Sequence, residues 1–299
     1  MVETNSLKSW LLAARPKTLP AAIVPVWVGN VPVLFGDGDF SWLLLRCTLL
    51  SCICIQIATN FFNDAIDFKK GADTEKRLGP IRVTASGMLS QKMVLGAAMG
   101  FCLLAALISI PMIMERGPVI IVIGVIALFL AYGYTGGPVP LAYRGLGELF
   151  VILFFGFVAV VGSYWVQTGE WPAPLQVWLL ALMTGLYSTV LIAINNLRDV
   201  AEDSGTGKRT LAVRFGKRFA RIEIFLLVVT PAVIGFLMAF QTRNHFGEIG
   251  FVILLIVGQG IAKGVRKNEP GPIYNKYLAL SGLMLIGFAV VITLFFWRI

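Results

Sequence analysis

Long apolar stretches divide the chain from near its start to its end. The hydrocarbon core of a bilayer is about 30 Å thick and needs roughly 20 apolar residues per helix. Stretches that meet or approach this length lie near residues 18–35, 41–62, 92–114, 118–135, 146–167, 175–196, 221–241, 248–263 and 277–297. The pattern predicts an all-α polytopic membrane bundle of about nine transmembrane helices. The stretch at 248–263 is short, and only residues 114–118 separate the third stretch from the fourth, so eight or ten spans stay open.

The composition agrees with a membrane protein. Hydrophobic residues make up 57% of the 299 residues and charged residues only 14%, against about 25% charged residues in soluble domains. So few charged side chains cannot cover a soluble globule of this size. We therefore expect residues 1–299 to form a single transmembrane domain. Residues 1–10 include Glu3 and lack the apolar run and cleavage site of a signal peptide, so we expect the first apolar stretch to be retained as a helix.

The net charge of +9 could indicate a nucleic-acid partner, but its distribution favours a membrane explanation. If the N-terminus is cytoplasmic, 21 of the 25 Lys and Arg residues fall in cytoplasmic segments. The others are Arg46, Arg116, Arg243 and Arg298. Lys and Arg collect in cytoplasmic loops, so this distribution predicts a cytoplasmic N-terminus and no nucleic-acid partner.

Cysteine and histidine offer little chemistry. The cysteines lie inside apolar stretches without the paired spacing of a zinc site, at positions 47, 52, 54 and 102. His245 is the only histidine. This composition argues against histidine-rich metal sites and against Ser-His-Asp catalysis.

Aspartate is clustered. Of the seven aspartates, five lie in two polar intervals, 63–91 and 197–220, each following an even-numbered span. If the second helix continues to about residue 68, one of its faces carries Asn60, Asn63, Asp64 and Asp67, and Asp73 follows. The second interval places on one helical face Asn195, Asn196, Asp199 and Asp203. Both acidic groups are predicted to lie on the cytoplasmic side.

Carboxylates one helical turn apart repel each other, so a cation is expected beside them. Oxygen ligands without His or Cys favour Mg²⁺, which commonly completes its coordination with substrate phosphates. Basic residues near the two acidic groups would bind the same phosphates. These are Lys69, Lys70, Lys76, Arg77, Arg82, Arg198, Lys208 and Arg209. The alternative is that both groups are ordinary polar helix ends whose basic residues only set topology, as we expect for Lys217, Arg218 and Arg221.

Two further segments carry candidate binding residues. Glycines and prolines permit a compact turn over 132–148, where Tyr134, Tyr143 and Arg144 could contact a charged intermediate or a phosphate. Tyrosines at a membrane boundary can equally be interfacial anchors. Near the N-terminus, Arg15 and Lys17 form a basic entry into the first helix and are weaker candidates for substrate binding.

The two acidic motifs resemble those of the UbiA-type intramembrane prenyltransferases. They read Asn-Asp-x-x-Asp at 63–67 and Asp-x-x-x-Asp at 199–203. Four longer strings resemble the branch of this superfamily that prenylates 1,4-dihydroxy-2-naphthoate in menaquinone synthesis. They are RPKTLPAAIVPVWVG at 15–29, ATNFFNDAIDFKKGADTEKRLGPIRVTASG at 58–87, YGYTGGPVPLAYRGLGE at 132–148 and NNLRDVAEDSGTGKRTLAVRFG at 195–216.

The resemblance implies a helical bundle in a bacterial inner membrane, with a central cavity that is polar at its cytoplasmic mouth and open sideways to lipid. It implies that polyprenyl diphosphate and dihydroxynaphthoate are the substrates, and that pyrophosphate and CO₂ leave. The residues it implies as Mg²⁺ ligands are Asp64, Asp67, Asp199 and Asp203, with Asn60, Asn63 and Asn196 as supporting diphosphate contacts. A common form of the family has an aspartate where this chain has Gly71, so Asp73, two residues later, is an open candidate ligand.

Two alternatives stay open. The acidic motifs handle only the diphosphate, so the acceptor could instead be 4-hydroxybenzoate, homogentisate, a haem or chlorophyll precursor, or a glycerophosphate. A secondary transporter would also carry membrane carboxylates, but near the middle of the bilayer, whereas these are predicted to lie at one face beside Lys and Arg. The sequence predicts neither the prenyl chain length nor the oligomeric state.

Overall fold

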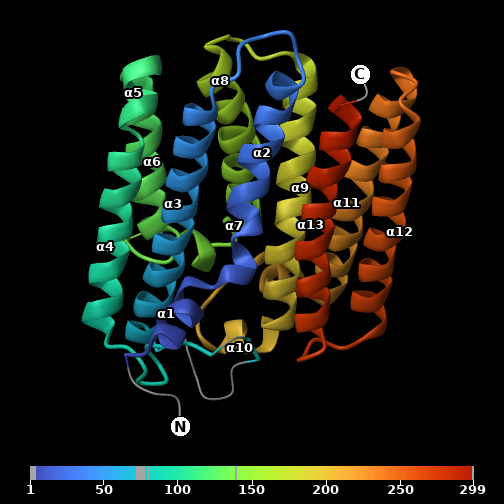
Figure 1. Cartoon of the computed structure of the whole chain (residues 1–299). Helices are drawn as coiled ribbons and strands as arrows, with labels where there is room; N and C mark the ends of the chain where they lie inside the picture. The colour runs from blue at the N-terminus through green and yellow to red at the C-terminus, as the bar shows by residue number, and fades with distance from the viewer. Residues whose placement is uncertain (1–4, 72–77, 80, 139, 298–299) are drawn as a thin grey trace.

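The chain folds as a bundle of long helices (Figure 1). The computed structural model describes residues 5–71, 78–79, 81–138 and 140–297, which contain helices and no strand. In chain order the helices are α1 (Leu7–Ala14), η1 (Pro16–Thr18), α2 (Pro20–Leu34), α3 (Trp42–Lys69), α4 (Gln91–Ile108), α5 (Ile110–Arg116), α6 (Val119–Gly133), η2 (Leu141–Tyr143), α7 (Gly147–Val151), η3 (Ile152–Val161), α8 (Gly162–Thr168), α9 (Leu175–Arg198), α10 (Val200–Gly205), α11 (Leu211–Gln241), α12 (His245–Lys267) and α13 (Tyr274–Trp297).

The predicted membrane bundle is confirmed, because each predicted apolar stretch coincides with helix. Seven helical segments are long and apolar enough to cross a membrane: α3, α4 with α5, α7 to α8, α9, α11, α12 and α13. Residues 7–18 and α2 meet at a bend of 47° and together would form an eighth span, while α6 is shorter. The count of nine spans stays a prediction.

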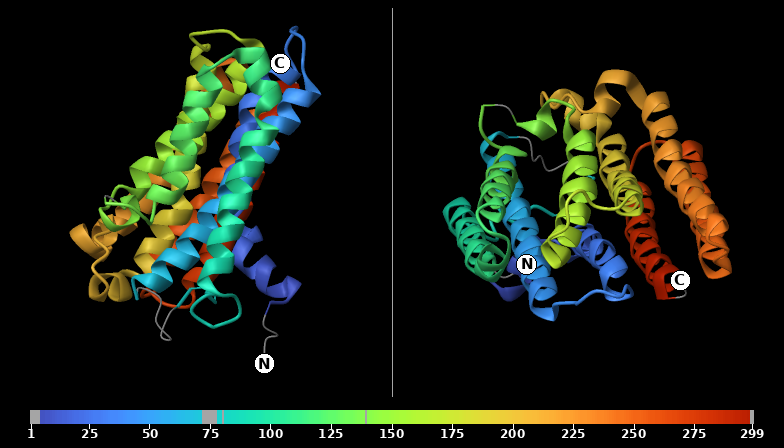
Figure 2. Two further views of the ribbon diagram at one scale, coloured as in Figure 1. Left: turned by 90° about the vertical axis from the view of Figure 1, so that its left-hand side faces the viewer. Right: turned by 90° about the horizontal axis from the view of Figure 1, so that it is seen from above.

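The helix α9 lies in the middle of the bundle, between α2, η3, α11 and α13. Its buried residues, among them Leu180, Val190 and Ile194, belong to the largest apolar core of the described chain. A second core joins α1, α3 and α4 to the turn after residue 81. Figure 1 shows α1 and α10 at the same end of the bundle as the N-terminus, and the C-terminus at the opposite end. The view down the bundle in Figure 2 shows α4 and α12 on opposite flanks.

Small residues explain why α12 is longer than its sequence pattern indicated. It runs for 23 residues from His245, and the side chain of its N-cap Asn244 accepts a hydrogen bond from Gly247 N. Gly250 packs against Val291 of α13, and Gly258 packs against Val228 of α11. In water glycine weakens a helix, but in a membrane bundle it lets helices approach closely. The glycines that shortened the predicted stretch are therefore packing positions.

Two helix ends decide where the polar residues lie. The helix α3 continues to Lys69, as predicted, so it carries the first acidic group on its last turns. The helix α9 ends at Arg198, and Asp199 (φ −92°, ψ 7°) separates it from α10. The single helical face predicted for the second group is thus interrupted at Asp199. Aspartate favours such helix ends because its short side chain competes for nearby hydrogen-bonding groups.

Candidate active site

Asp64 of α3 is held by backbone groups of the connection between α3 and α4. It is 1% exposed, and its carboxylate accepts hydrogen bonds from the backbone N–H groups of Val83 (3.2 Å) and Thr84 (2.9 Å). Arg15 Nη2 lies 3.9 Å from its Oδ2. Two backbone donors and a guanidinium stabilise the charged carboxylate in a buried position.

Asp67, one turn later, meets cations from two other parts of the chain. Arg82 Nη2 donates to Asp67 Oδ2 at 3.1 Å, and Tyr143 OH donates to Oδ1 at 2.9 Å. Lys208 Nζ lies 3.7 Å from Oδ2. Asp67 is 3% exposed, so these groups replace the water that a free carboxylate would bind.

The second acidic group is built around Arg198, which is 1% exposed. Its Nε and Nη2 donate to the two oxygens of Asp199, each at 2.7 Å. The same guanidinium donates to Asn195 Oδ1 at 2.9 Å and to Asn275 Oδ1 at 2.7 Å. Bidentate pairing of this kind fixes both side chains. Asp199 is therefore held in one orientation by Arg198.

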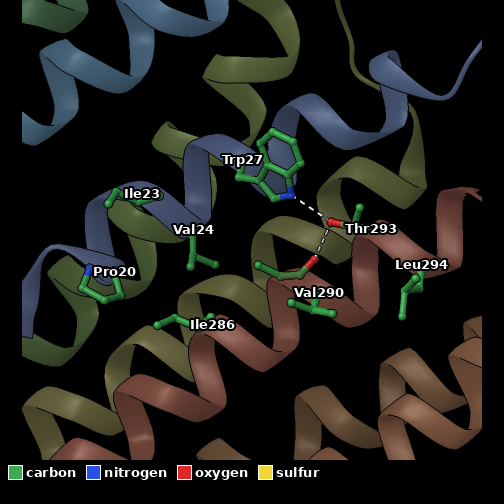
Figure 3. Close-up of a pocket in the computed structure, with 9 residues that line it drawn as sticks. Pro20, Ile23, Val24, Trp27, Ile286, Val290, Thr293 and Leu294 are labelled. Atoms are coloured by element: carbon green, nitrogen blue, oxygen red, sulfur yellow. Dashed lines mark hydrogen bonds between the residues drawn. The ribbon is translucent and has the colours of Figure 1, made fainter.

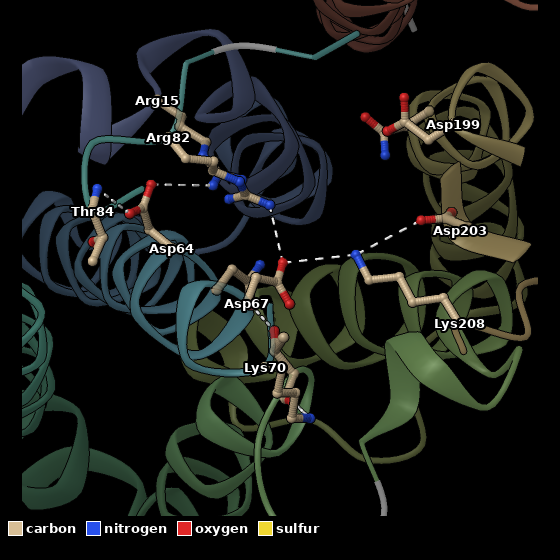
Figure 4. Close-up of polar contacts among 12 residues, drawn as sticks. Arg15, Asp64, Asp67, Lys70, Arg82, Thr84, Asp199, Asp203 and Lys208 are labelled. Atoms are coloured by element: carbon tan, nitrogen blue, oxygen red, sulfur yellow. Dashed lines mark hydrogen bonds and ion pairs between the residues drawn. The ribbon is translucent and has the colours of Figure 1, made fainter. Parts of the chain in front are cut away.

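Lys208 joins the two acidic groups. Its Nζ lies 3.7 Å from Asp67 and 3.9 Å from Asp203 Oδ1, and Figure 4 shows the ammonium between the two carboxylates. Asp64 and Asp199 flank this pair on either side (Figure 4). Residues 136 positions apart, Asp67 and Asp203, thus share one cation. The positive charge between them offsets their mutual repulsion.

Tyr143 provides an aromatic face beside this cation. Lys70 Nζ lies 4.2 Å from the centroid of the Tyr143 ring, and Lys208 Nζ lies 5.3 Å from it. Lys70 also donates to Thr135 O at 2.6 Å. Partial burial lowers the pKa of Lys70, Asp67 opposes this shift, and the charge of Lys208 adds to it. Of the candidates in the 132–148 segment, Tyr143 therefore lies beside Asp67, Lys70 and Lys208.

The asparagines of the two motifs connect the site to neighbouring elements. Asn60 Nδ2 donates to Ala14 O at 2.9 Å and to Thr18 Oγ1 at 3.0 Å. Asn63 Oδ1 accepts a hydrogen bond from Thr135 Oγ1. Asn196 Nδ2 donates to Glu148 Oε1 at 2.7 Å. Thr135, Asn275 and Glu148 were not among the residues selected from the sequence. The first two belong to no recognisable motif, whereas Glu148 is an acid inside a predicted span, which is itself a signal of function.

Some predicted residues lie at the margin of the site. The side chains of Lys69, Arg144 and Arg209 are exposed, although Arg209 N donates to Tyr143 O at 3.0 Å. The ring of Tyr134 packs on Phe150, with 5.7 Å between centroids. The candidates outside the described residues are Asp73, Lys76 and Arg77.

The donor set fits a hard divalent cation that shares its shell with a substrate. In the described part of the chain, no three His, Cys, Asp or Glu residues come close enough to hold a metal ion by themselves. Mg²⁺ is usually bound through one or two carboxylates together with water and phosphate oxygens. Asp64 and Asp67 lie on one side of Lys208, and Asp199 and Asp203 lie on the other. Two carboxylates on each side meet that requirement.

An apolar groove of about 500 Å³ runs between α2 and α13. Figure 3 shows its lining, in which Trp27 Nε1 donates to Thr293 Oγ1 at 2.8 Å. The groove includes Pro20, two residues after Thr18, which accepts the hydrogen bond from Asn60. The lining of the groove thus includes a residue close in the chain to a contact of Asn60.

Comparison with known proteins decides the family. The model of the UbiA prenyltransferase family matches residues 22–286. The chain belongs to the UbiA prenyltransferase family. Several curated relatives carry the name 1,4-dihydroxy-2-naphthoate octaprenyltransferase. The Haemophilus influenzae protein is 34% identical over 263 residues, 84% of this chain and 83% of that protein. The Mycobacterium leprae protein is 30% identical over 289 residues, 96% of this chain and 95% of that protein.

Solved structures of UbiA homologs share the fold. A homolog from Aeropyrum pernix K1 has a TM-score of 0.68 at 14% identity and covers 90% of this chain and 97% of its own. A homolog from Archaeoglobus fulgidus bound to GPP and Mg²⁺ has a TM-score of 0.64 at 16% identity and covers 95% of this chain and 99% of its own. The bundle described above is thus the UbiA-family fold.

Proposed function

We propose that this UbiA-family protein transfers a polyprenyl group from polyprenyl diphosphate to 1,4-dihydroxy-2-naphthoate, releasing pyrophosphate and CO₂ and giving demethylmenaquinol. The geometry that carries the proposal is the meeting of Asp67 and Asp203 at Lys208, which brings both acidic groups to one end of the bundle. The choice of acceptor is supported by the curated relatives, whose name specifies dihydroxynaphthoate.

We further propose that Asp64, Asp67, Asp199 and Asp203 bind Mg²⁺ together with the diphosphate. A solved UbiA homolog holds GPP and Mg²⁺, and the oxygen donors of this chain suit the same ion. When bound there, Mg²⁺ supplies positive charge that stabilises the pyrophosphate leaving group.

The basic side chains have a second role in this proposal. In the structure, Arg82 and Lys208 lie against Asp67, and Arg198 lies against Asp199, so that they offset the negative charges. Beside a diphosphate they can donate to its oxygens, which gain charge as the bond to the prenyl carbon breaks. Asn60, Asn63 and Asn196 keep the surrounding elements in place. The prenyl chain is as apolar as lipid and would lie along the groove between α2 and α13.

The experiment measures product formation in membranes that contain the protein. With polyprenyl diphosphate, dihydroxynaphthoate and Mg²⁺, we expect demethylmenaquinol by mass and an equal amount of pyrophosphate, and EDTA should abolish both. D64N and D199N should each lower turnover at least about 100-fold, because each removes a carboxylate ligand of the Mg²⁺ that would stabilise the leaving group. The matched control is D39N, in the exposed connection between α2 and α3. Retained turnover in D64N or D199N would contradict the metal assignment.

The same assay tests the acceptor. Parallel reactions contain 4-hydroxybenzoate or homogentisate in place of dihydroxynaphthoate. Faster product formation with either one would overturn the proposed acceptor and leave the diphosphate chemistry standing.

A further inference from the structure

Glu148 is a carboxyl group buried inside the bundle. It lies in the first turn of α7, within the membrane-spanning segment Gly147–Thr168, and is 4% exposed. None of the ion pairs among the described residues includes it. An acid at such a position is costly to bury and marks a functional site more often than a structural one.

Only one of its two oxygens is satisfied. Asn196 Nδ2 donates to Oε1 at 2.7 Å, whereas Oε2 is buried and has no hydrogen-bond partner among the described residues. A buried acceptor left without a donor costs free energy unless a ligand supplies one. The unpaired oxygen is therefore suited to an O–H donor that arrives with a substrate.

The position of Glu148 relates it to the diphosphate site. Its partner Asn196 precedes Asp199 by three residues. At 1.5 Å per residue, Asn196 therefore lies about 4.5 Å farther from the α10 end of the bundle than Asp199 does. The Tyr134 hydroxyl lies beside Gly147, the residue before Glu148, and Tyr143 of the same 132–148 segment donates to Asp67. Glu148 thus lies about one helical turn below the carboxylates, at the depth where the first carbon of a prenyl diphosphate would follow its phosphates.

We propose that Glu148 moves a proton in the reaction: its free Oε2 takes the proton of the acceptor hydroxyl next to the attacked ring carbon and returns it after CO₂ has left. This inference rests on the proposed function, because the hydroxyl beside the carboxylate-bearing carbon is a feature of 1,4-dihydroxy-2-naphthoate. The titratable and polar groups that face Glu148 are Tyr134 at the end of α6, Asn196 of α9 and Glu223 of α11.

The first step forms the bond between ring carbon 2 and the allylic carbon. The allylic C–O bond breaks, and its electron pair leaves with pyrophosphate. The electrons of the neighbouring O–H bond become those of a ketone at carbon 1, and the proton passes to Glu148 Oε2. Carbon 2 is then tetrahedral and carries both the prenyl group and the carboxylate.

The second step is the decarboxylation of a β-keto acid. The bond from carbon 2 to the carboxylate breaks, its electron pair restores the aromatic ring, and the carbonyl oxygen takes the proton back from Glu148. CO₂ leaves, the hydroquinone product is complete and the Glu148 carboxylate is regenerated. The cycle needs no oxidant or reductant.

The decisive variant is E148Q. Glutamine keeps an oxygen that accepts from Asn196 and keeps the shape of the side chain, but it cannot take up a proton. We expect kcat to fall at least about 100-fold, since general acid–base groups contribute about 10² to 10⁴ in rate, while KM for polyprenyl diphosphate changes less than about threefold. The remaining rate should rise about tenfold per pH unit as the acceptor hydroxyl ionises in solution, a rise that the wild type should lack.

Two further variants separate proton transfer from folding. E148D keeps a carboxylate and should retain at least about a tenth of wild-type turnover. E223Q makes the same chemical change on the neighbouring acid of α11 and should stay within about threefold of the wild type. Wild-type turnover in E148Q, a loss without the pH dependence, or a loss in E148D as deep as in E148Q would overturn the inference alone. A wild-type protein that forms no product from dihydroxynaphthoate would overturn the proposed function, and this inference with it.

Discussion

Tyr143 contacts both halves of the site with two different parts of its side chain. Its hydroxyl donates to Asp67 Oδ1 at 2.9 Å, and its ring lies beside the ammonium groups of Lys70 and Lys208. Y143F keeps the ring and removes the donor. A hydrogen bond to a charged group is worth about 1.5–3 kcal/mol, so we expect turnover to fall about tenfold or more and the midpoint of thermal unfolding to fall by several degrees. Initial rates of pyrophosphate release measure the effect.

Tyr132 supplies the matched control. It is exposed and packs edge-to-face on Phe62, with 5.6 Å between ring centroids. Y132F should stay within about twofold of the wild type, because it removes no hydrogen bond to a carboxylate. Equal losses in Y143F and Y132F would mean that the Asp67 contact carries no weight in the reaction.

At the residue scale, the sequence pattern predicted which charges gather but not how they pair. The spacing of Asp64 and Asp67 was enough to place both on the last turns of α3. The pairing of Arg198 with Asp199 and Asn275, or of Lys208 with Asp67, depends on contacts between segments far apart in the chain. No local periodicity encodes such contacts. The sequence pattern therefore yielded the members of the site and left its geometry open.

At the element scale, the packing of η3 against α9 depends on two glycines that face each other. A Cβ added at Gly156 would lie 2.6 Å from Ala181 O and 3.0 Å from Gly185 Cα, both backbone atoms that cannot rotate away. G156A must therefore push the helices apart. Overpacking of this kind costs about 1–3 kcal/mol, so we expect the midpoint of thermal unfolding in detergent to fall by about 5 °C.

The control for this change is Gly162, at the start of α8. A Cβ there has no heavy atom within 4 Å, and its backbone is helical (φ −61°). G162A should leave the midpoint unchanged or raise it slightly, because alanine favours helix over glycine by about 1 kcal/mol. A fall in G162A as large as in G156A would show that the close approach of η3 and α9 is not the cause.

The lengths of the apolar stretches predicted where the helices lie better than where each helix begins and ends. The stretch 175–196 corresponds closely to α9, because nothing interrupts its apolar run. The interruption at Asp199 and the kink of α11 at Gly216 (φ 82°, ψ 171°) depend on polar contacts and backbone geometry that hydropathy does not report. The short α6 likewise ends before the predicted boundary, where the turn of the 132–148 loop begins. Element boundaries thus follow from tertiary structure.

At the scale of the whole molecule, the excess positive charge has two causes. Basic residues in cytoplasmic loops orient a membrane protein, and the predicted distribution of 21 against 4 follows that rule. Arg198 and Lys208, however, are held against carboxylates within the bundle end rather than displayed in a loop. Part of the excess positive charge therefore belongs to the polar site and not to exposed loops.

The sidedness of that face can be measured by cysteine labelling. Figure 1 places α10 and the connection between α2 and α3 at opposite ends of the bundle, and Ser204 and Asp37 are exposed there. In a variant whose four cysteines, all within α3 and α4, are replaced, a membrane-impermeant maleimide should label D37C in intact cells. It should label S204C only in inside-out vesicles, because α10 lies at the same end of the bundle as the N-terminus, which is predicted to be cytoplasmic. Labelling of S204C in intact cells would reverse the orientation. Labelling of both positions from one side would contradict a membrane crossing between the two ends of the bundle.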